Sequence, residues 1–160
     1  MDYVGFLPTD PLTFISISGG KFWQWDINGH QISSIYDGTH ITFPPGHARF
    51  ALCNRSSITV QNSNSRVIAA EFHVADEETE CCCFSPNGKL VAAAAGHTIY
   101  VWDITTPDPH LIETFVGHTN KITSLVFSSS SSLISASKDQ LVKFWKIGVL
   151  LCSDSEGIRT

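Results

Sequence analysis

The chain repeats itself with a period of about 40 residues, and this feature limits its possible folds more than any other. Laying Trp102 on Trp145, at an offset of 43 residues, aligns 79–103 with 122–146 without a gap. Offsets of 41 and 77 residues add two more degenerate copies, so that four units account for nearly all of the 160 residues. Such a period is typical of solenoids and propellers, in which each unit packs against its neighbours. We expect units at about 3–36, 37–75, 76–117 and 118–152.

Each unit is predicted to consist of short β-strands separated by turns. The third unit contains four apolar runs of strand length, punctuated by Gly88, Gly96 and a loop that contains prolines. No segment keeps the apolar spacing of a helix over a window of about 11 residues. The alanine run 92–95 favours a helix by propensity, but its register with 135–138 predicts a crowded strand. The sequence therefore predicts an all-β fold of four four-stranded antiparallel sheets.

Composition narrows the possible partners. The chain is 42% hydrophobic and only 16% charged, with a net charge of -5, so it has enough apolar surface to fold. Ten Lys and Arg residues scattered along an acidic chain leave no basic patch for phosphate backbones or acidic membranes. We expect neither nucleic acid nor a membrane as a partner. An acidic N-terminus without an apolar leader predicts an intracellular protein, cytoplasmic or nuclear.

The cysteines indicate core packing and no special chemistry. There are five, and three of them, at 81–83, are consecutive. This arrangement fits neither the disulfide framework of a secreted domain nor the spacing of a zinc site. We interpret the run as small apolar residues of a buried strand, and we expect no metal and no cofactor.

The repeat units resemble WD40 repeats, the four-stranded blades of β-propellers. The resemblance rests on the period, on a Gly-His pair before the first strand and on a Trp-Asp pair that closes the third strand. These pairs are Gly117-His118 in the fourth unit, Trp25-Asp26 in the first and Trp102-Asp103 in the third. The implied fold is a β-propeller built of WD40 blades.

The resemblance also favours an incomplete ring, with a four-bladed ring, or two copies that complete an eight-bladed one, as the alternatives. Propellers of this family commonly close with seven blades, and residues 153–160 are similar to the start of a further blade. Residues 115–148 further resemble the WD40 arrays of fungal NACHT-type signalling proteins. Open blade edges would allow the chain to associate with itself.

In WD40 blades a His, a Ser, an Asp and a Trp form a buried chain of hydrogen bonds. A buried carboxylate and imidazole are tolerated only when both are satisfied, which such a chain achieves. By alignment, the first and third units have Ile15 and Ala92 at the Ser position, so only the fourth unit keeps the whole set. The resemblance places the structural relay at His118, Ser135, Asp139 and Trp145.

The resemblance implies a docking face as well, because the loops between blades and the turns after each second strand gather on one side of a propeller. Acidic positions fall in the second and third units and basic ones in the fourth, which suits a partner of mixed charge. The candidate partner-binding positions are Asp37, Thr39, Asn54, Ser56, Glu78, Glu80, His97, Lys121, Thr123, Lys138 and Gln140.

The function that follows is a non-catalytic scaffold that binds other proteins or peptides, or the sensor or docking half of a larger signalling protein. A truncated or degenerate gene fragment without an independent function is the alternative. A hydrolase is less well supported, because no GxSxG elbow accompanies the serine, histidine and aspartate of the fourth unit. We therefore expect no catalytic residues.

Overall fold

The computed structural model describes residues 3–7, 10–18, 21–37, 40–44, 46, 49–62, 68–74, 78–106 and 108–148. Within these ranges the regular elements are all β-strands, arranged in four antiparallel sheets. Sheet 1 consists of β1 (Tyr3–Leu7), β2 (Asp10–Ser18), β3 (Lys21–Asp26) and β4 (Gln31–Asp37). Sheet 2 consists of β5 (His40–Thr42), β6 (Arg49–Cys53), β7 (Ser57–Asn62) and β8 (Ile68–His73).

The other two sheets contain the strongest repeats. Sheet 3 consists of β9 (Thr79–Phe84), β10 (Leu90–Ala95), β11 (Thr98–Asp103) and β12 (His110–Val116). Sheet 4 consists of β13 (Ile122–Ser129), β14 (Ser132–Ser137) and β15 (Val142–Lys146). Each sheet pairs its strands in chain order. Four strands were predicted for the last unit, and the structure describes three of them. Residues 149–160 lie outside the described part of the chain.

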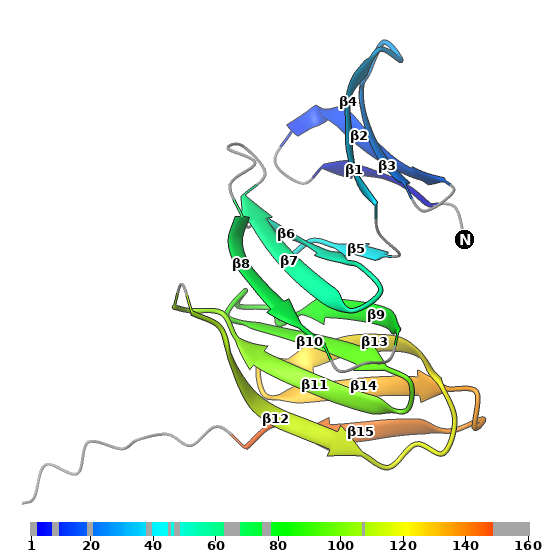
Figure 1. The fold of residues 1–160 in the computed structure, drawn as a ribbon, viewed down its shortest axis with the longest axis vertical. Helices are drawn as coiled ribbons and strands as arrows, with labels where there is room; N and C mark the ends of the chain where they lie inside the picture. The colour runs from blue at the N-terminus through cyan, green and yellow to red at the C-terminus, as the bar shows by residue number, and fades with distance from the viewer. Residues whose placement is uncertain are drawn as a thin grey trace, which may run out of the picture.

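Sheet 1 lies at one end of the long axis and sheet 2 follows it, whereas sheets 3 and 4 pack side by side at the other end (Figure 1). Each junction has its own apolar core, because each inner sheet presents apolar side chains on both faces. Ile58 and Val60 of sheet 2 join a cluster with Val91 of sheet 3, whereas Ile99 and Ile122 join sheet 3 to sheet 4. The all-β, blade-like prediction is confirmed, and over the described residues the stack does not close into a ring.

The alanine run forms β10, between β9 and β11, so the predicted strand is confirmed. All six residues of β10, the four alanines included, are buried. Alternate residues face opposite sides of a strand: Ala93 and Ala95 join the core toward sheet 2, and Ala92 and Ala94 the core toward sheet 4. A strand packed on both faces has room only for small side chains, which explains a composition that otherwise favours a helix.

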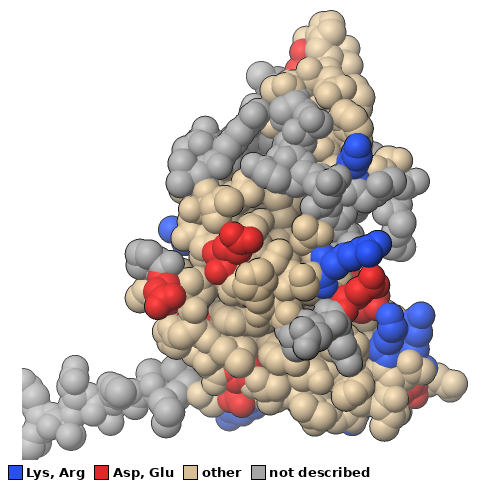
Figure 2. Space-filling view, viewed as in Figure 1, with Lys and Arg blue, Asp and Glu red and all other residues tan. Residues whose placement is uncertain are grey.

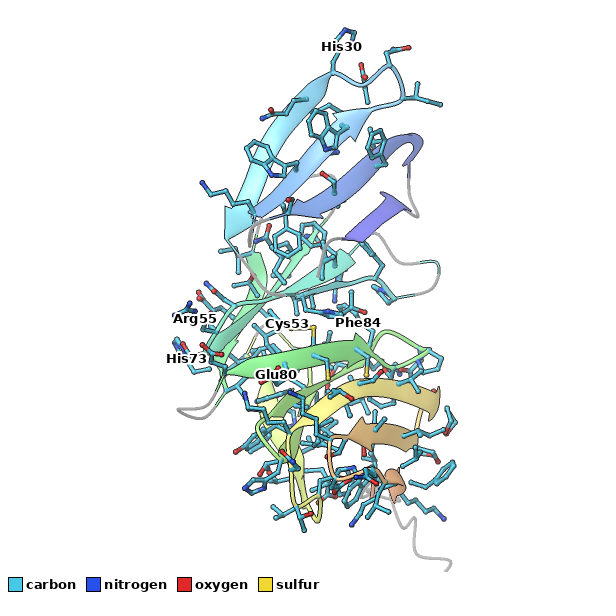
Figure 3. All side chains as sticks on the ribbon, turned by 90° about the vertical axis from the view of Figure 1, so that its right-hand side faces the viewer. His30, Cys53, Arg55, His73, Glu80 and Phe84 are labelled. Carbon is cyan, nitrogen blue, oxygen red and sulfur yellow. A yellow bond between two sulfur atoms is a disulfide. The ribbon has the colours of Figure 1, made fainter. Side chains whose placement is uncertain are left out.

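The cysteine run is buried, as predicted, but the expectation that its members only fill the core was wrong. Cys82 forms a disulfide with Cys53 of β6, which joins sheet 3 to sheet 2 (Figure 3). Strand alternation turns Cys81 and Cys83 to the other side, into the core shared with sheet 4. Burial raises the pKa of the Cys81 thiol to about 12 and also raises that of Cys83, so both stay protonated. The pairing escaped sequence reasoning because the two cysteines belong to different repeat units, 29 residues apart.

Candidate functional site

The structure brings the four predicted relay residues together at the junction of sheets 3 and 4. The imidazole of His118 lies 2.7 Å from Asp139 Oδ2 through Nδ1 and 2.7 Å from Ser135 Oγ through Nε2. The indole Nε1 of Trp145 donates to the same Ser135 hydroxyl at 2.8 Å. The side chains of His118 and Asp139 are 0% and 4% exposed, so this chain satisfies polar groups that have almost no access to water.

Asp139 also binds the backbone on both sides of the relay. Its Oδ2 accepts the amide of Thr119 at 3.0 Å, and its Oδ1 accepts the amide of Leu141 at 2.9 Å. Desolvation opposes the charge of the carboxyl group, but the hydrogen bonds from His118 and these two amides outweigh it and lower the pKa of Asp139 to about 2. The ionised carboxylate thus ties the β12–β13 connection to the β14–β15 turn.

Gly117 places the backbone directly against the indole of Trp145. A Cβ atom at this position would lie 3.0 Å from Cη2 of the indole, tighter than an ordinary contact. Phe115 packs on the indole from sheet 3, at a ring-centroid distance of 5.1 Å. The Gly-His pair of the fourth unit therefore has a steric reason for its glycine and a hydrogen-bonding reason for its histidine.

The sequence alignment placed the Ser position of the other units one residue too early. In sheet 4 the relay tryptophan, Trp145, pairs with Leu133, and Ser135 follows Leu133 by two residues. In sheet 1 Trp25 pairs with Phe14, and Ser16 follows Phe14 by two residues. Trp25 Nε1 donates to Ser16 Oγ at 2.8 Å, so sheet 1 keeps the Ser-Trp half of the relay. Ser16, and not Ile15, is the equivalent of Ser135.

The same shift applies to sheet 3, where the register places Ala93, and not Ala92, at the Ser position. The cause is a connection between the second and third strands that is one residue shorter than in sheet 4. A gapless alignment of the sequence cannot detect this shift.

The aspartates of the two Trp-Asp pairs fix the turns that follow their strands. Asp26 accepts the amide of His30 at 2.8 Å, and this bond is the main cause of the lowered pKa of Asp26. Burial opposes the charge of Asp103, but the hydroxyl and amide of Thr105, at 2.6 and 2.8 Å, outweigh it and lower its pKa. Trp102 is buried and packs against Phe72 of sheet 2 with the two rings tilted, at a ring-centroid distance of 4.6 Å. Both pairs are therefore structural.

A hollow of about 450 Å³ opens beside the relay, on the edge of the stack where β10 turns into β11 and β12 leads into β13. We call this edge the loop face; it lies at the right of Figure 1. Three predicted partner positions from three separate segments meet there. The hollow is lined by Glu78, Gly96, His97, Thr119, Asn120 and Lys121. Of these, Gly96, Thr119 and Asn120 were not predicted, because nothing in their sequence context distinguishes them from other turn residues.

Opposite charges alternate along the loop face, as Figure 2 shows at the right-hand edge of the middle and lower sheets. Lys121 Nζ lies 2.6 Å from Glu80 Oε1, an ion pair that crosses from sheet 4 to sheet 3. Arg55, a residue that sequence reasoning missed, lies 3.7 Å from Glu78 and crosses from sheet 2. Figure 3 shows Arg55 and Glu80 on this side of the molecule. The acidic and basic positions are thus interleaved and not separated into two arcs.

The remaining predicted positions do not line the hollow, and the structure describes all of them except Thr39. Asn54 and Ser56 form the β6–β7 turn around Arg55, and Thr123 is exposed near the start of β13. The amide of Lys138 donates to Lys121 O at 2.9 Å, which places the β14–β15 turn next to the hollow. Gln140, in that turn, has a φ of 69°. Asp37 ends β4 in sheet 1, and Thr39 lies outside the described residues.

Comparisons with known proteins agree with this architecture. Residues 71–103 and 109–146 match the family model for the WD domain, G-beta repeat (WD40). Human WD repeat-containing protein 37 is 36% identical over 73 residues, which cover 45% of this chain and 15% of that protein. The target of rapamycin complex subunit wat1 of Schizosaccharomyces pombe is 29% identical over 108 residues, 66% of this chain and 34% of that protein.

A third similar protein is the transcriptional corepressor LEUNIG_HOMOLOG of Arabidopsis thaliana, 27% identical over 127 residues, which cover 76% of this chain and 16% of that protein. The chain therefore spans at most about a third of the length of these three relatives. The two segments that match the WD40 repeat model contain β9–β11 of sheet 3 and, in the second segment, β12 with β13–β15 of sheet 4. The narrower resemblance to fungal NACHT-type arrays stays a prediction.

We predict that Ser135→Ala lowers the free energy of unfolding by about 1–3 kcal/mol, because His118 Nε2 and Trp145 Nε1 lose their shared partner in a buried site. Urea denaturation measures the change. Ser124→Ala, at an exposed serine of the neighbouring strand, is the control and should stay within about 0.5 kcal/mol of the parent. Equal effects of the two substitutions would show that the relay does not stabilise the fold.

We also predict that the relay has an acid limit. Because the folded-state pKa of Asp139 lies near 2, below its ordinary value of 3.8, its charge stabilises the fold above pH 3.8, and this contribution disappears as the pH falls toward 2. The difference in stability between the parent chain and Asp139→Asn should therefore be constant near neutral pH and shrink in acid. Urea denaturation over a pH series measures it. A difference that is independent of pH would refute the assigned charge state.

Proposed function

We propose that this WD40-repeat protein is a non-catalytic scaffold that binds other proteins through its loop face, inside the cell. The observation that carries the proposal is the hollow itself, in which segments from β8–β9, β10–β11 and β12–β13 converge beside a rigid relay. A volume of about 450 Å³ is within the usual range of ligand pockets and has room for a few side chains of a bound segment. Its lining includes one acidic side chain, Glu78, and one basic side chain, Lys121.

The alternating charges indicate the kind of segment that would bind. Glu78 and Lys121 border the same hollow, and each is paired with a residue of a neighbouring segment. Such half-exposed pairs contribute little to stability, so a partner's own acidic and basic side chains can compete for them at low cost. We therefore expect a peptide or protein loop that carries charges of both signs.

The buried relay argues against catalysis at the serine. Ser135 is 1% exposed, and its hydroxyl lies between the imidazole of His118 and the indole of Trp145. A nucleophile needs an open approach for its substrate, and no such approach leads to this oxygen. Among the described residues, no group of three or more His, Cys, Asp or Glu side chains could hold a metal ion, and no helix is long and apolar enough to cross a membrane.

Two of the relatives are a subunit of a target of rapamycin complex and a transcriptional corepressor, and both names describe proteins that work with other proteins. They support protein partners for this chain and fit a place as the docking half of a larger signalling protein. The alternative, a degenerate fragment without a function of its own, differs in predicting no specific capture at all.

We predict that Lys121→Glu reduces peptide binding about tenfold or more, because it reverses a charge at the hollow and places a second carboxylate beside that of Glu80. A displayed library of random peptides, enriched on the parent chain, serves as the probe. Lys138→Glu should also weaken binding of the enriched peptides. Lys146→Glu, at an exposed lysine at the end of β15, is the control and should bind them like the parent chain.

Melting temperatures should change little, because surface ion pairs contribute at most about 1 kcal/mol. Enrichment of no peptide on the parent chain, or equal binding by all three variants, would contradict a docking role for the loop face.

A second observation supports self-association. The outer face of sheet 4 exposes a row of apolar side chains, with Val126 opposite Ile134 and Ile134 opposite Phe144. Phe144 is 77% exposed, and Val142 and Val126 are also exposed. Soluble domains seldom leave such a continuous apolar sheet face open to water.

We predict that the chain forms dimers or larger assemblies through this face at micromolar concentration, and that Phe144→Ser with Val126→Ser shifts it to monomer. Sedimentation equilibrium gives the mass over a dilution series. Ile27→Ser, at an exposed apolar residue of sheet 1, is the control and should leave the mass unchanged. A parent chain that is monomeric at every concentration would contradict the proposal.

A further inference from the structure

A second groove lies between sheets 2 and 3, on the edge opposite the loop face. Two hollows of about 350 and 230 Å³ share Arg49, Ile104 and Thr105, so together they form one continuous groove. The strand register fixes its location. Arg49 pairs with Asn62 at the end of the β6–β7 hairpin that is remote from its turn, and the same end of the β10–β11 hairpin pairs Leu90 with Asp103. The loop-face hollow and this groove are therefore separate sites.

The charged side chains that line the groove are both cationic. Arg49 approaches from the start of β6 in sheet 2, and Lys89 from the β9–β10 turn in sheet 3. Both are exposed, and neither forms a salt bridge within the described part of the chain. Asn62 adds an amide group to the same wall. On a chain with a net charge of -5, this is a local concentration of positive hydrogen-bond donors.

An acidic group beside the groove, Asp103, offsets part of this positive charge. The carboxylate of Asp103 accepts the hydroxyl and the amide of Thr105, at 2.6 and 2.8 Å, so both hydrogen bonds hold it in the turn after β11. It is not among the lining residues, although Lys89 acts on it through space. The hydroxyl of Thr106 donates to Asp108 O at 2.8 Å. Among the described lining residues, the side chains of Arg49, Lys89 and Asn62 carry donors that can face a ligand.

The floor of the groove is apolar and rigid. Ile104, Val60 and Ala70 are buried and belong to the core between sheets 2 and 3, and Ala69 lies beside them. Ile104 is fixed by its amide, which donates to Lys89 O at 2.9 Å. A groove with an apolar floor and cations on opposite walls fits a chain segment that carries one strong anion and lies extended over small side chains.

We propose that this groove binds a phosphorylated peptide segment, with the phosphate held between Arg49 and Lys89 and the flanking residues lying over Ile104 and Ala69. A phosphate group carries close to two negative charges and three acceptor oxygens, so it can engage both cations at once, whereas a carboxylate offers one charge and two oxygens. Arg49 supplies the planar, forked donors that suit phosphate, and Lys89 supplies a point charge. The site is independent of the docking function proposed for the loop face.

Three pools of fluorescent peptides test the proposal, each with randomised flanks and a fixed central residue: phosphoserine, serine or glutamate. The full chain should bind the phosphoserine pool about tenfold more strongly than either other pool, measured by anisotropy, and the affinity should fall with added salt. Equal binding of the serine pool would overturn the site, and equal binding of the glutamate pool would overturn the assignment to phosphate.

Variants locate the binding on the molecule. Arg49→Gln and Lys89→Gln each remove a positive charge from an exposed side chain and keep a polar end group. Each should weaken binding of the phosphoserine pool about tenfold, with an unchanged melting temperature. Lys146→Gln, at an exposed lysine at the end of β15, is the matched control and should bind this pool like the parent. Full binding by Arg49→Gln and Lys89→Gln would overturn the proposal. Loss only with a further variant, Lys121→Gln at the loop-face hollow, would assign the phosphopeptide to the loop face and leave the proposed docking function intact.

Discussion

The packing of one sheet on the next is the interaction on which the rest of the structure depends. The inner sheets are apolar on both faces, so each is stable only between two others, and small side chains in β10 allow that double contact. The disulfide between Cys53 and Cys82 and the cross-sheet ion pairs add links at the same junctions. Because the turns are attached to stacked sheets, the loop face and the opposite groove both arise at the edges of junctions.

At the junction of sheets 3 and 4 the packing is completed by polar contacts. The relay from Asp139 to Trp145 satisfies the polar groups of four side chains that are buried or partly buried. It fixes the β12–β13 connection, which lines the loop-face hollow, to the β14–β15 turn. Sheet 1 keeps only the bond between Trp25 and Ser16, and sheet 3 has alanine at that position. The hollow therefore lies beside the part of the molecule whose loops are tied most firmly.

Much of this could be predicted from the repeat. The offset of 43 residues located the strands of sheets 3 and 4, and the relay residues followed from the family resemblance. What could not be predicted depended on spatial register: Ser16 was missed because one turn is a residue shorter, and Cys53 because its partner lies in another unit. Arg55 and Arg49 are ordinary polar positions in the sequence, and they gain meaning only when the sheets bring Glu78 and Lys89 near them.

The central claim is that the loop face beside the relay is where partners bind. Hydrogen–deuterium exchange of the chain, with and without a peptide enriched on it, tests this claim most directly. The account predicts slower exchange at the amides of His97, Asn120 and Lys121, which border the hollow, and unchanged exchange across the outer face of sheet 4. Protection confined to sheet 1 or to the outer face of sheet 4, with none at the hollow, would contradict it.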